Sequence, residues 1–136
     1  MTNTKIIIDG NGAIFGRICS FAAKKALEGN EIVIVNSEKV IISGNKKDVL
    51  KKHAKIRDVG GHSLKGPKYS TIAYKILKRG VKGMLPDFRK GIGKQALLRI
   101  KCYNGIPKEF ENEKMIKSKK QKPGKYIILK ELSEKL

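Results

Sequence analysis

The apolar residues near the start of the chain fall into three runs whose spacing predicts a strand, a helix and a second strand. Lys5–Ile8 contains three consecutive isoleucines, which is typical of a buried strand. From Ile14 onward the apolar residues recur at helical spacing until Gly29-Asn30, a pair typical of a helix end. Glu31–Val35 is rich in Ile and Val and predicts another buried strand. A strand–helix–strand unit of about 30 residues joins parallel strands by a right-handed crossover, so the pattern predicts an α/β fold.

The middle of the chain continues this alternation of extended and helical patterns. Val40–Ser43 follows the second strand too closely for a parallel return, so it is either an antiparallel strand or a continuation of the same strand. Helical spacing predicts helices over Lys46–Arg57 and Thr71–Lys82. It also predicts one over Ile92–Ile100, with Ile92 among its inward residues, followed by a strand at Lys101–Tyr103.

Beyond Pro107 the pattern changes, because the chain is polar and lysine-rich as far as Lys125. Such composition is typical of an arm that gains order only on a partner. Tyr126–Leu129 and Glu131–Leu136 are apolar enough to predict a small docking element at the end of this arm. We therefore divide the chain into a core domain, residues 1–107, and a basic C-terminal extension, residues 108–136.

Positive charge is concentrated in one part of the chain, whose formal net charge is +19. Residues 62–101 contain eleven Lys and Arg and a single acid, Asp87. Because like charges held close together repel one another, such a concentration predicts a polyanionic partner, and nucleic acid is the first candidate. With four Phe, four Tyr and no Trp, the chain has few rings on which to stack bases. Recognition of phosphates and of RNA shape fits this composition better.

The basic residues also follow helical spacing. Over Thr71–Lys82 four cations fall at positions i, i+3, i+4 and i+7, which places them on one face. An ordinary solvated face mixes both signs, yet no acid lies between residues 65 and 82. A second series of lysines recurs every four residues in Lys46–Arg57. We expect phosphate contacts from these faces and from neighbouring cations, namely Arg17, Lys47, Lys51, Lys55, Arg57, Lys65, Lys68, Lys75, Lys78, Arg79, Lys82, Arg89, Lys90, Lys94, Arg99 and Lys101.

Two glycine motifs resemble nucleotide-binding sites without matching them. Gly10-x-Gly12-x-x-x-Gly16 follows a strand as a dinucleotide fingerprint does, but its third glycine comes one residue late. A tight turn accounts for these glycines better. Arg17 is unfavourable to the dipole of the following helix and is better explained by a phosphate near the helix start. Gly61–Lys68 resembles a phosphate-binding loop, but Pro67 removes an amide that the phosphate would need. We expect no cofactor.

Catalytic and metal sites find no support in the sequence. The acids are scattered, and His53 falls on an apolar helical face, where a structural role is expected. Cys19 and Cys102 match no metal-ligand spacing and suit a reducing compartment as small core residues. The three isoleucines near the N-terminus are too few for a signal or a membrane span. We expect a cytoplasmic protein with no membrane partner and no small-molecule substrate.

Several short segments stand out in order along the chain. They are Ile8-Asp9-Gly10 with Gly16-Arg17, Val35–Lys39, Ile42–Asn45, Lys65-Gly66-Pro67, Val81–Pro86 and Arg99–Pro107. Together they resemble the ribosomal protein L13 family of the large subunit, and the pattern leans toward its archaeal and eukaryotic branch. The similarity covers about Lys5–Pro107, with a weaker echo in Tyr126–Leu132, and departs at Gly80, where relatives tend to carry Thr or Ala.

The resemblance implies a structural constituent of the large ribosomal subunit with no catalytic activity, cofactor or metal. It implies binding to large-subunit rRNA and contact with neighbouring large-subunit ribosomal proteins. It also implies a three-layer α/β/α core with a central, mainly parallel four-stranded sheet. Two alternatives remain: a nucleic-acid-binding regulator outside the ribosome, and a small nucleotide-dependent enzyme built on the turn Gly10–Gly16.

Overall fold

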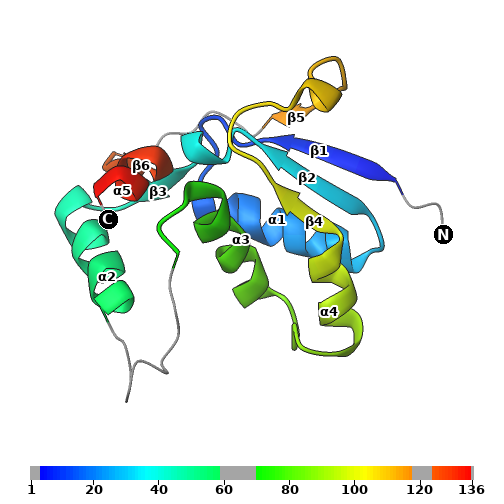
Figure 1. The fold of residues 1–136 in the computed structure, drawn as a ribbon, viewed down its shortest axis with the longest axis horizontal. Helices are drawn as coiled ribbons and strands as arrows, with labels where there is room; N and C mark the ends of the chain where they lie inside the picture. Colours follow the sequence, from blue (N-terminus) through cyan, green and yellow to red (C-terminus); the bar gives the residue numbers. More distant parts are fainter. Residues whose placement is uncertain (1–3, 59–69, 118–123, 136) are drawn as a thin grey trace.

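The computed structural model describes residues 4–58, 70–117 and 124–135, which form an α/β fold (Figure 1). The expected contacts Lys65 and Lys68, and the motif Gly61–Lys68, lie outside the described residues, as does the side chain of Arg57. The elements in chain order are β1 (Lys5–Asp9), α1 (Phe15–Leu27), β2 (Glu31–Val35), η1 (Ser37–Lys39), β3 (Ile41–Ser43), α2 (Lys46–Asp58), α3 (Ala73–Met84), α4 (Gly91–Leu98), β4 (Ile100–Cys102), η3 (Lys108–Phe110), β5 (Ile116–Lys117), β6 (Tyr126–Ile128) and α5 (Leu129–Lys135).

The main sheet has four strands in the order β4-β2-β1-β5, and every pairing within it is parallel. β1 and β2 pair along their full length, from Lys5 opposite Glu31 to Asp9 opposite Val35. Helix α1 connects these two strands, as the spacing of the apolar residues predicts. The α/β class and the mainly parallel four-stranded sheet are confirmed.

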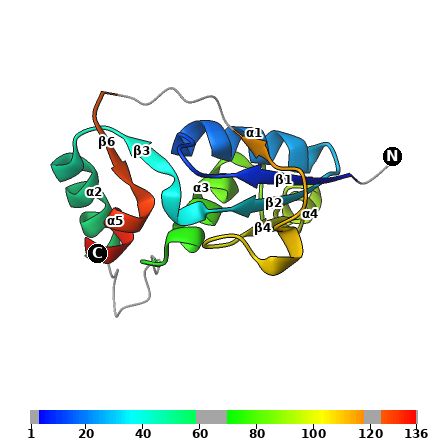
Figure 2. The same cartoon turned by 90° about the horizontal axis from the view of Figure 1, so that it is seen from above.

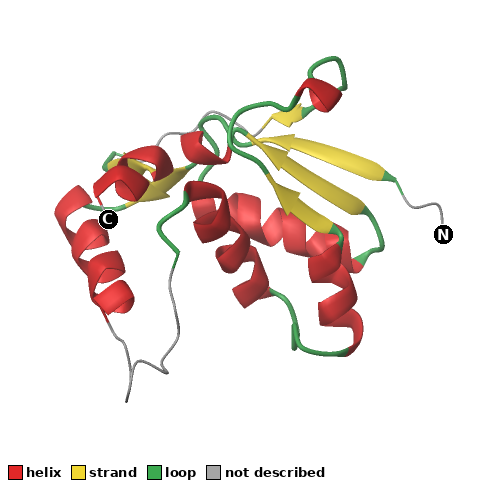
Figure 3. Ribbon diagram, in the orientation of Figure 1, coloured by secondary structure: helices red, strands yellow, loops and turns green. Residues whose placement is uncertain are grey.

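Side chains alternate between the two faces of the sheet, and the two faces are covered differently. Helices α1, α3 and α4 lie together on one face, where Ile32, Ile34 and Ile100 are completely buried (Figures 1 and 3). On the other face Val33 packs in a smaller cluster with Phe110 of η3. The third layer of the core is therefore a single 3₁₀ turn and its flanking loop, whereas the sheet's other face has a full helical layer.

The C-terminal residues join the core. β6 pairs antiparallel with β3 in a separate two-stranded sheet, with Ser43 opposite Tyr126 (Figure 2). Of the two alternatives left open for Val40–Ser43, continuation of β2 is wrong: Ile41–Ser43 is a separate strand, antiparallel to a partner near the end of the chain, and Ile41 also makes an isolated parallel bridge with Ile14. Ile127, Leu129 and Leu132 are completely buried in the main cluster, so these residues pack as part of the core. The described part of the expected arm forms η3 and β5, while the domain boundary at residue 107 stays a prediction.

The turn after β1 is explained by close packing. The amide of Gly10 donates to the carbonyl of Val35 at 2.8 Å, and a Cβ at Gly10 would lie 2.9 Å from a methyl of Val40. Gly12 has a φ of +75°, which favours glycine. Both glycines therefore have structural reasons to be there, as a tight turn predicts.

Helices α1 and α3 approach closely at Gly80. A Cβ there would lie 2.5 Å from the ring of Phe15 and 3.1 Å from Sγ of Cys19. Gly80, where the sequence differs from the family it resembles, therefore leaves the space that the ring of Phe15 occupies.

The start of α4 differs from the sequence prediction. Ile92, expected to point inward, is 67% exposed, whereas Gly93 and Ala96 are buried. The reason is a backbone contact: a Cβ at Gly93 would overlap the carbonyl oxygens of Pro86 and Asp87. Only a glycine lets the loop pass so close, and this contact turns Ile92 toward solvent.

Replacing Gly93 with alanine is therefore expected to destabilise the protein by about 1–3 kcal/mol through overpacking against backbone, although alanine is the better helix former by about 1 kcal/mol. Gly83→Ala is the matched control, because a Cβ at that helical position meets nothing within 4 Å. It should leave stability unchanged or raise it by up to about 1 kcal/mol. Urea unfolding of both variants tests the contrast, and a stabilised Gly93→Ala protein contradicts it.

Candidate nucleic-acid interface

Helix α3 has an apolar face in the core and a basic face outside it. Ile76, Leu77 and Val81 are buried beneath the sheet. The four cations predicted from the spacing lie together on the other side, around one shallow depression of about 230 Å³ that also reaches helix α4. This depression, the α3 groove, is lined by Ser70, Lys75, Ile76, Lys78, Arg79, Lys82 and Leu97.

The α3 groove is strongly positive, because four of the described side chains that line it are cations and none of them is a carboxylate. Within the described part of the chain, no ion pair involves Lys75, Lys78 or Lys82. The ammonium of Lys82 lies 4.0 Å from the ring centroid of Phe88, and Arg89 lies over the same ring at 5.6 Å. Phe88 thus holds two cations at the edge of the groove. Sequence reasoning missed this ring, although an aromatic residue directly before Arg89 was a signal for it.

Three helix N-termini have no compensating negative charge of their own. The N-cap residues of α1, α3 and α4 are Ile14, Ile72 and Lys90, none of which makes a side-chain cap hydrogen bond, and no acid lies in the first turn of any of the three helices. Backbone amides at such helix starts carry partial positive charge and attract anions. Arg17 lies exposed in the first turn of α1, as expected of a phosphate contact.

The other expected contacts fall on three further parts of the surface. Lys47, Lys51 and Lys55 are all exposed along α2, which stands apart from α3 (Figure 1). Arg89, Lys90 and Lys94 are exposed around the start of α4, next to the α3 groove. Arg17 shares a separate, mainly apolar pocket of about 400 Å³ with Lys117.

Two of the expected contacts have other surroundings. The guanidinium of Arg99 donates to the carbonyl of Ala26 at 3.0 Å, and so it satisfies a carbonyl in the last turn of α1. Lys101 pairs with Val33 in the sheet and points to the face that η3 covers, opposite the helices. The structure therefore gives Arg99 a structural partner and places Lys101 away from the α3 groove.

The buried titratable side chains belong to the core. Burial raises the pKa of the Cys19 thiol to about 12, and that of the Cys102 thiol likewise to about 12. Both cysteines are free. His53 is half-buried, and this burial lowers its pKa. In the described residues no group of three or more His, Cys, Asp and Glu side chains could hold a metal ion. Nor does any described helix have the length and apolar character needed to cross a membrane.

We expect both thiols to resist a disulfide-exchange reagent such as Ellman's in the native protein. With a pKa of about 12, the reactive thiolate is on the order of 10⁻⁴ of each thiol near pH 8, and Cys19 is fully enclosed. In denaturant both should react at once. The absorbance of the coloured thiolate that the reagent releases measures the reaction over time. Rapid release from the folded protein contradicts the buried positions of the two thiols.

Comparison with known proteins completes this description. The family model of ribosomal protein L13 matches residues 3–109. The chain belongs to the ribosomal protein L13 family. Similar proteins, each named large ribosomal subunit protein uL13, occur in several archaea. The one from Methanocaldococcus jannaschii is 42% identical over 133 residues, 96% of each chain. The one from Thermoplasma acidophilum is 41% identical over 111 residues, 82% of this chain and 80% of that protein.

The match confirms the L13 resemblance drawn from the sequence segments, and the relatives lie in its archaeal branch. The L13 match spans β1 to η3, so it includes α3, α4 and the α3 groove. The similarity to the Methanocaldococcus jannaschii protein covers 96% of both chains, so it also extends to β6 and into α5.

Proposed function

We propose that this L13-family chain is a structural constituent of the large ribosomal subunit and binds large-subunit rRNA through its basic surface. The observation that carries the proposal is the α3 groove, where four cations and no carboxylate line the depression within residues 70–117. The family and the names of its archaeal members support the assignment. The function is structural rather than enzymatic, and the ribosome places it in the cytoplasm among other large-subunit proteins.

The α/β core acts as a rigid support for this surface. Because Ile76, Leu77 and Val81 of α3 are buried in the core, the helix holds its basic face at a fixed place on the surface of the domain. Lysine contacts with phosphate release condensed counterions and give affinity without reading the base sequence. Specificity then comes from the shape of the folded RNA, since helical RNA hides its major-groove edges. The contact residues are those expected from the sequence, with Arg99 having chiefly a structural role.

A salt titration and a sedimentation experiment together test the proposal. If six to ten phosphates are engaged, affinity for large-subunit rRNA should fall by about 10³–10⁵ between about 50 and 200 mM salt. A flat titration contradicts the phosphate contacts. The protein should also travel with large subunits after a moderate-salt wash. Salt-dependent RNA binding without such sedimentation favours a regulator outside the ribosome.

A further inference from the structure

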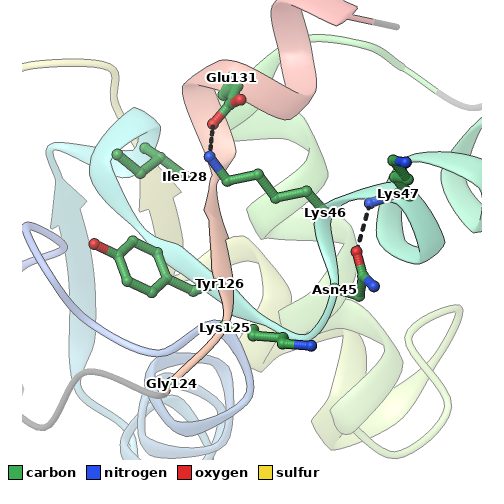
Figure 4. A pocket seen from close by; sticks show the side chains of 8 residues that line it. All are labelled: Asn45, Lys46, Lys47, Gly124, Lys125, Tyr126, Ile128 and Glu131. Carbon is green, nitrogen blue, oxygen red and sulfur yellow. Dashed lines mark hydrogen bonds and ion pairs between the residues drawn. The ribbon is translucent and has the colours of Figure 1, made fainter.

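Another pocket lies beside the smaller sheet, at strand β6, and is larger than the α3 groove. It has a volume of about 580 Å³, within the range of small-molecule sites. Strand β6 forms its floor, the start of α2 forms one wall and Glu131 of α5 closes one end (Figure 4). This β6 pocket is lined by Asn45, Lys46, Lys47, Gly124, Lys125, Tyr126, Ile128 and Glu131.

The rim of the β6 pocket is positive. Of the described residues that line it, three are lysines and one is a carboxylate. That carboxylate is already engaged, because Glu131 pairs with Lys46 at 3.4 Å and with Lys135 at 3.1 Å. The pair holds Lys46 across the pocket, while Lys47 and Lys125 stay without a carboxylate partner among the described residues (Figure 4). An anionic ligand therefore fits the rim.

The floor of the β6 pocket is apolar and contains an aromatic ring. Tyr126 and Ile128 project to the same side of β6, while Ile127 between them is buried in the core (Figure 4). Tyr126 is half-buried, and its neighbour across the strand pair is the small residue Ser43. Ile128 is 40% exposed. A flat apolar group can therefore rest against this floor.

We propose that the β6 pocket takes one unstacked nucleotide of a bound RNA. Its base would lie on Tyr126 and Ile128, and its phosphate would meet Lys47 and Lys125. A base supplies the flat apolar surface that the floor fits, and its phosphate supplies the charge that the rim fits. Lys47 also begins the lysine series of α2, so an RNA strand leaving the pocket continues along cations. The inference rests on the proposed function and adds a single-strand site to it.

The test compares single-stranded and duplex RNA in binding to three proteins: wild type, Tyr126→Ala and Tyr126→Phe. The probes are an oligo(U) of about eight nucleotides, which suits a single-strand site, and a blunt-ended RNA duplex, which offers no unpaired nucleotide. Tyr126→Ala should weaken oligo(U) binding by about tenfold to a hundredfold. It should leave duplex binding within about twofold, and Tyr126→Phe should behave as wild type, because it keeps the ring. Thermal unfolding shows whether each variant is folded. If Tyr126→Ala does not fold, Tyr126→Leu replaces it in the test, because leucine removes the ring and keeps an apolar side chain.

The other outcomes overturn the inference. Unchanged oligo(U) binding by folded Tyr126→Ala means that the pocket does not hold a base, and the rim then suits an acidic segment of a protein. An equal loss for both RNAs means that the ring supports the fold alone. Titration of the protein with uridine monophosphate distinguishes a nucleotide within an RNA strand from a free nucleotide. If uridine monophosphate binds more tightly than oligo(U), the pocket is a site for a free nucleotide. If the wild-type protein binds neither RNA, the proposed function itself is wrong.

Discussion

Replacing Lys75, Lys78 and Lys82 together by glutamate is expected to weaken binding to large-subunit rRNA by about a thousandfold. A contact between a charged donor and phosphate contributes about 1.5 kcal/mol or more, and about 1.4 kcal/mol corresponds to a factor of ten. The three lysines line the α3 groove and pair with no carboxylate in the described part of the chain. Their replacement therefore removes three phosphate contacts and adds repulsion. Filter binding at several salt concentrations measures the loss.

A charge-matched variant separates local contact from overall charge. Lys24→Glu, Lys39→Glu and Lys130→Glu change the same number of charges at exposed positions that are not expected to meet RNA. This variant should lose only the long-range part of the attraction, which salt screens, and at physiological salt it should bind much more tightly than the α3 variant. For the α3 variant, the slope of log affinity against log salt concentration should also fall by about one for each α3 lysine that contacts phosphate. Equal losses in both variants would mean that the α3 groove is not the contact surface.

Local spacing explains why the βαβ unit and the basic face of α3 were predictable from the sequence. Apolar runs and glycine stops mark β1, α1 and β2, and the cations of α3 recur at helical spacing within one element. Even there the helix begins two residues later than Thr71. The reason is local, since the amide of Ile72 donates to the hydroxyl of Ser70 at 3.2 Å and so holds the chain extended before the helix. The sequence pattern could not specify that bond.

Tertiary neighbours decide the features that the sequence did not predict. β5 is only two residues long and exists because Ile8 and Ile116 pair at the edge of the sheet. The hydrogen bond of Arg99 joins residues 73 positions apart. The β6 pocket combines the start of α2 with residues near the C-terminus, which no local pattern brings together. Charge composition predicted the kind of partner, whereas the shape of each site came from contacts distant in sequence.

Replacing Leu132 by alanine is expected to destabilise the whole protein by about 2–5 kcal/mol, because the substitution leaves a cavity in the core. Leu132 is completely buried in the same cluster as the helical face of the main sheet. Its helix, α5, has seven residues and is too short to be stable alone, so its packing determines whether it forms. Urea unfolding followed by circular dichroism measures the change.

Lys130→Ala is the matched control for this loss, because Lys130 lies two positions before Leu132 on the same short helix and is exposed. It should shift the free energy of unfolding by no more than about 0.5 kcal/mol. α5 is also tied to the segment before α3, since the hydroxyl of Ser133 donates to the carbonyl of Thr71 at 2.6 Å. Loss of α5 packing should therefore loosen the start of α3, and the RNA affinity of Leu132→Ala should fall with the folded fraction. A Leu132→Ala protein as stable as Lys130→Ala would show instead that α5 is a dispensable extension of the core.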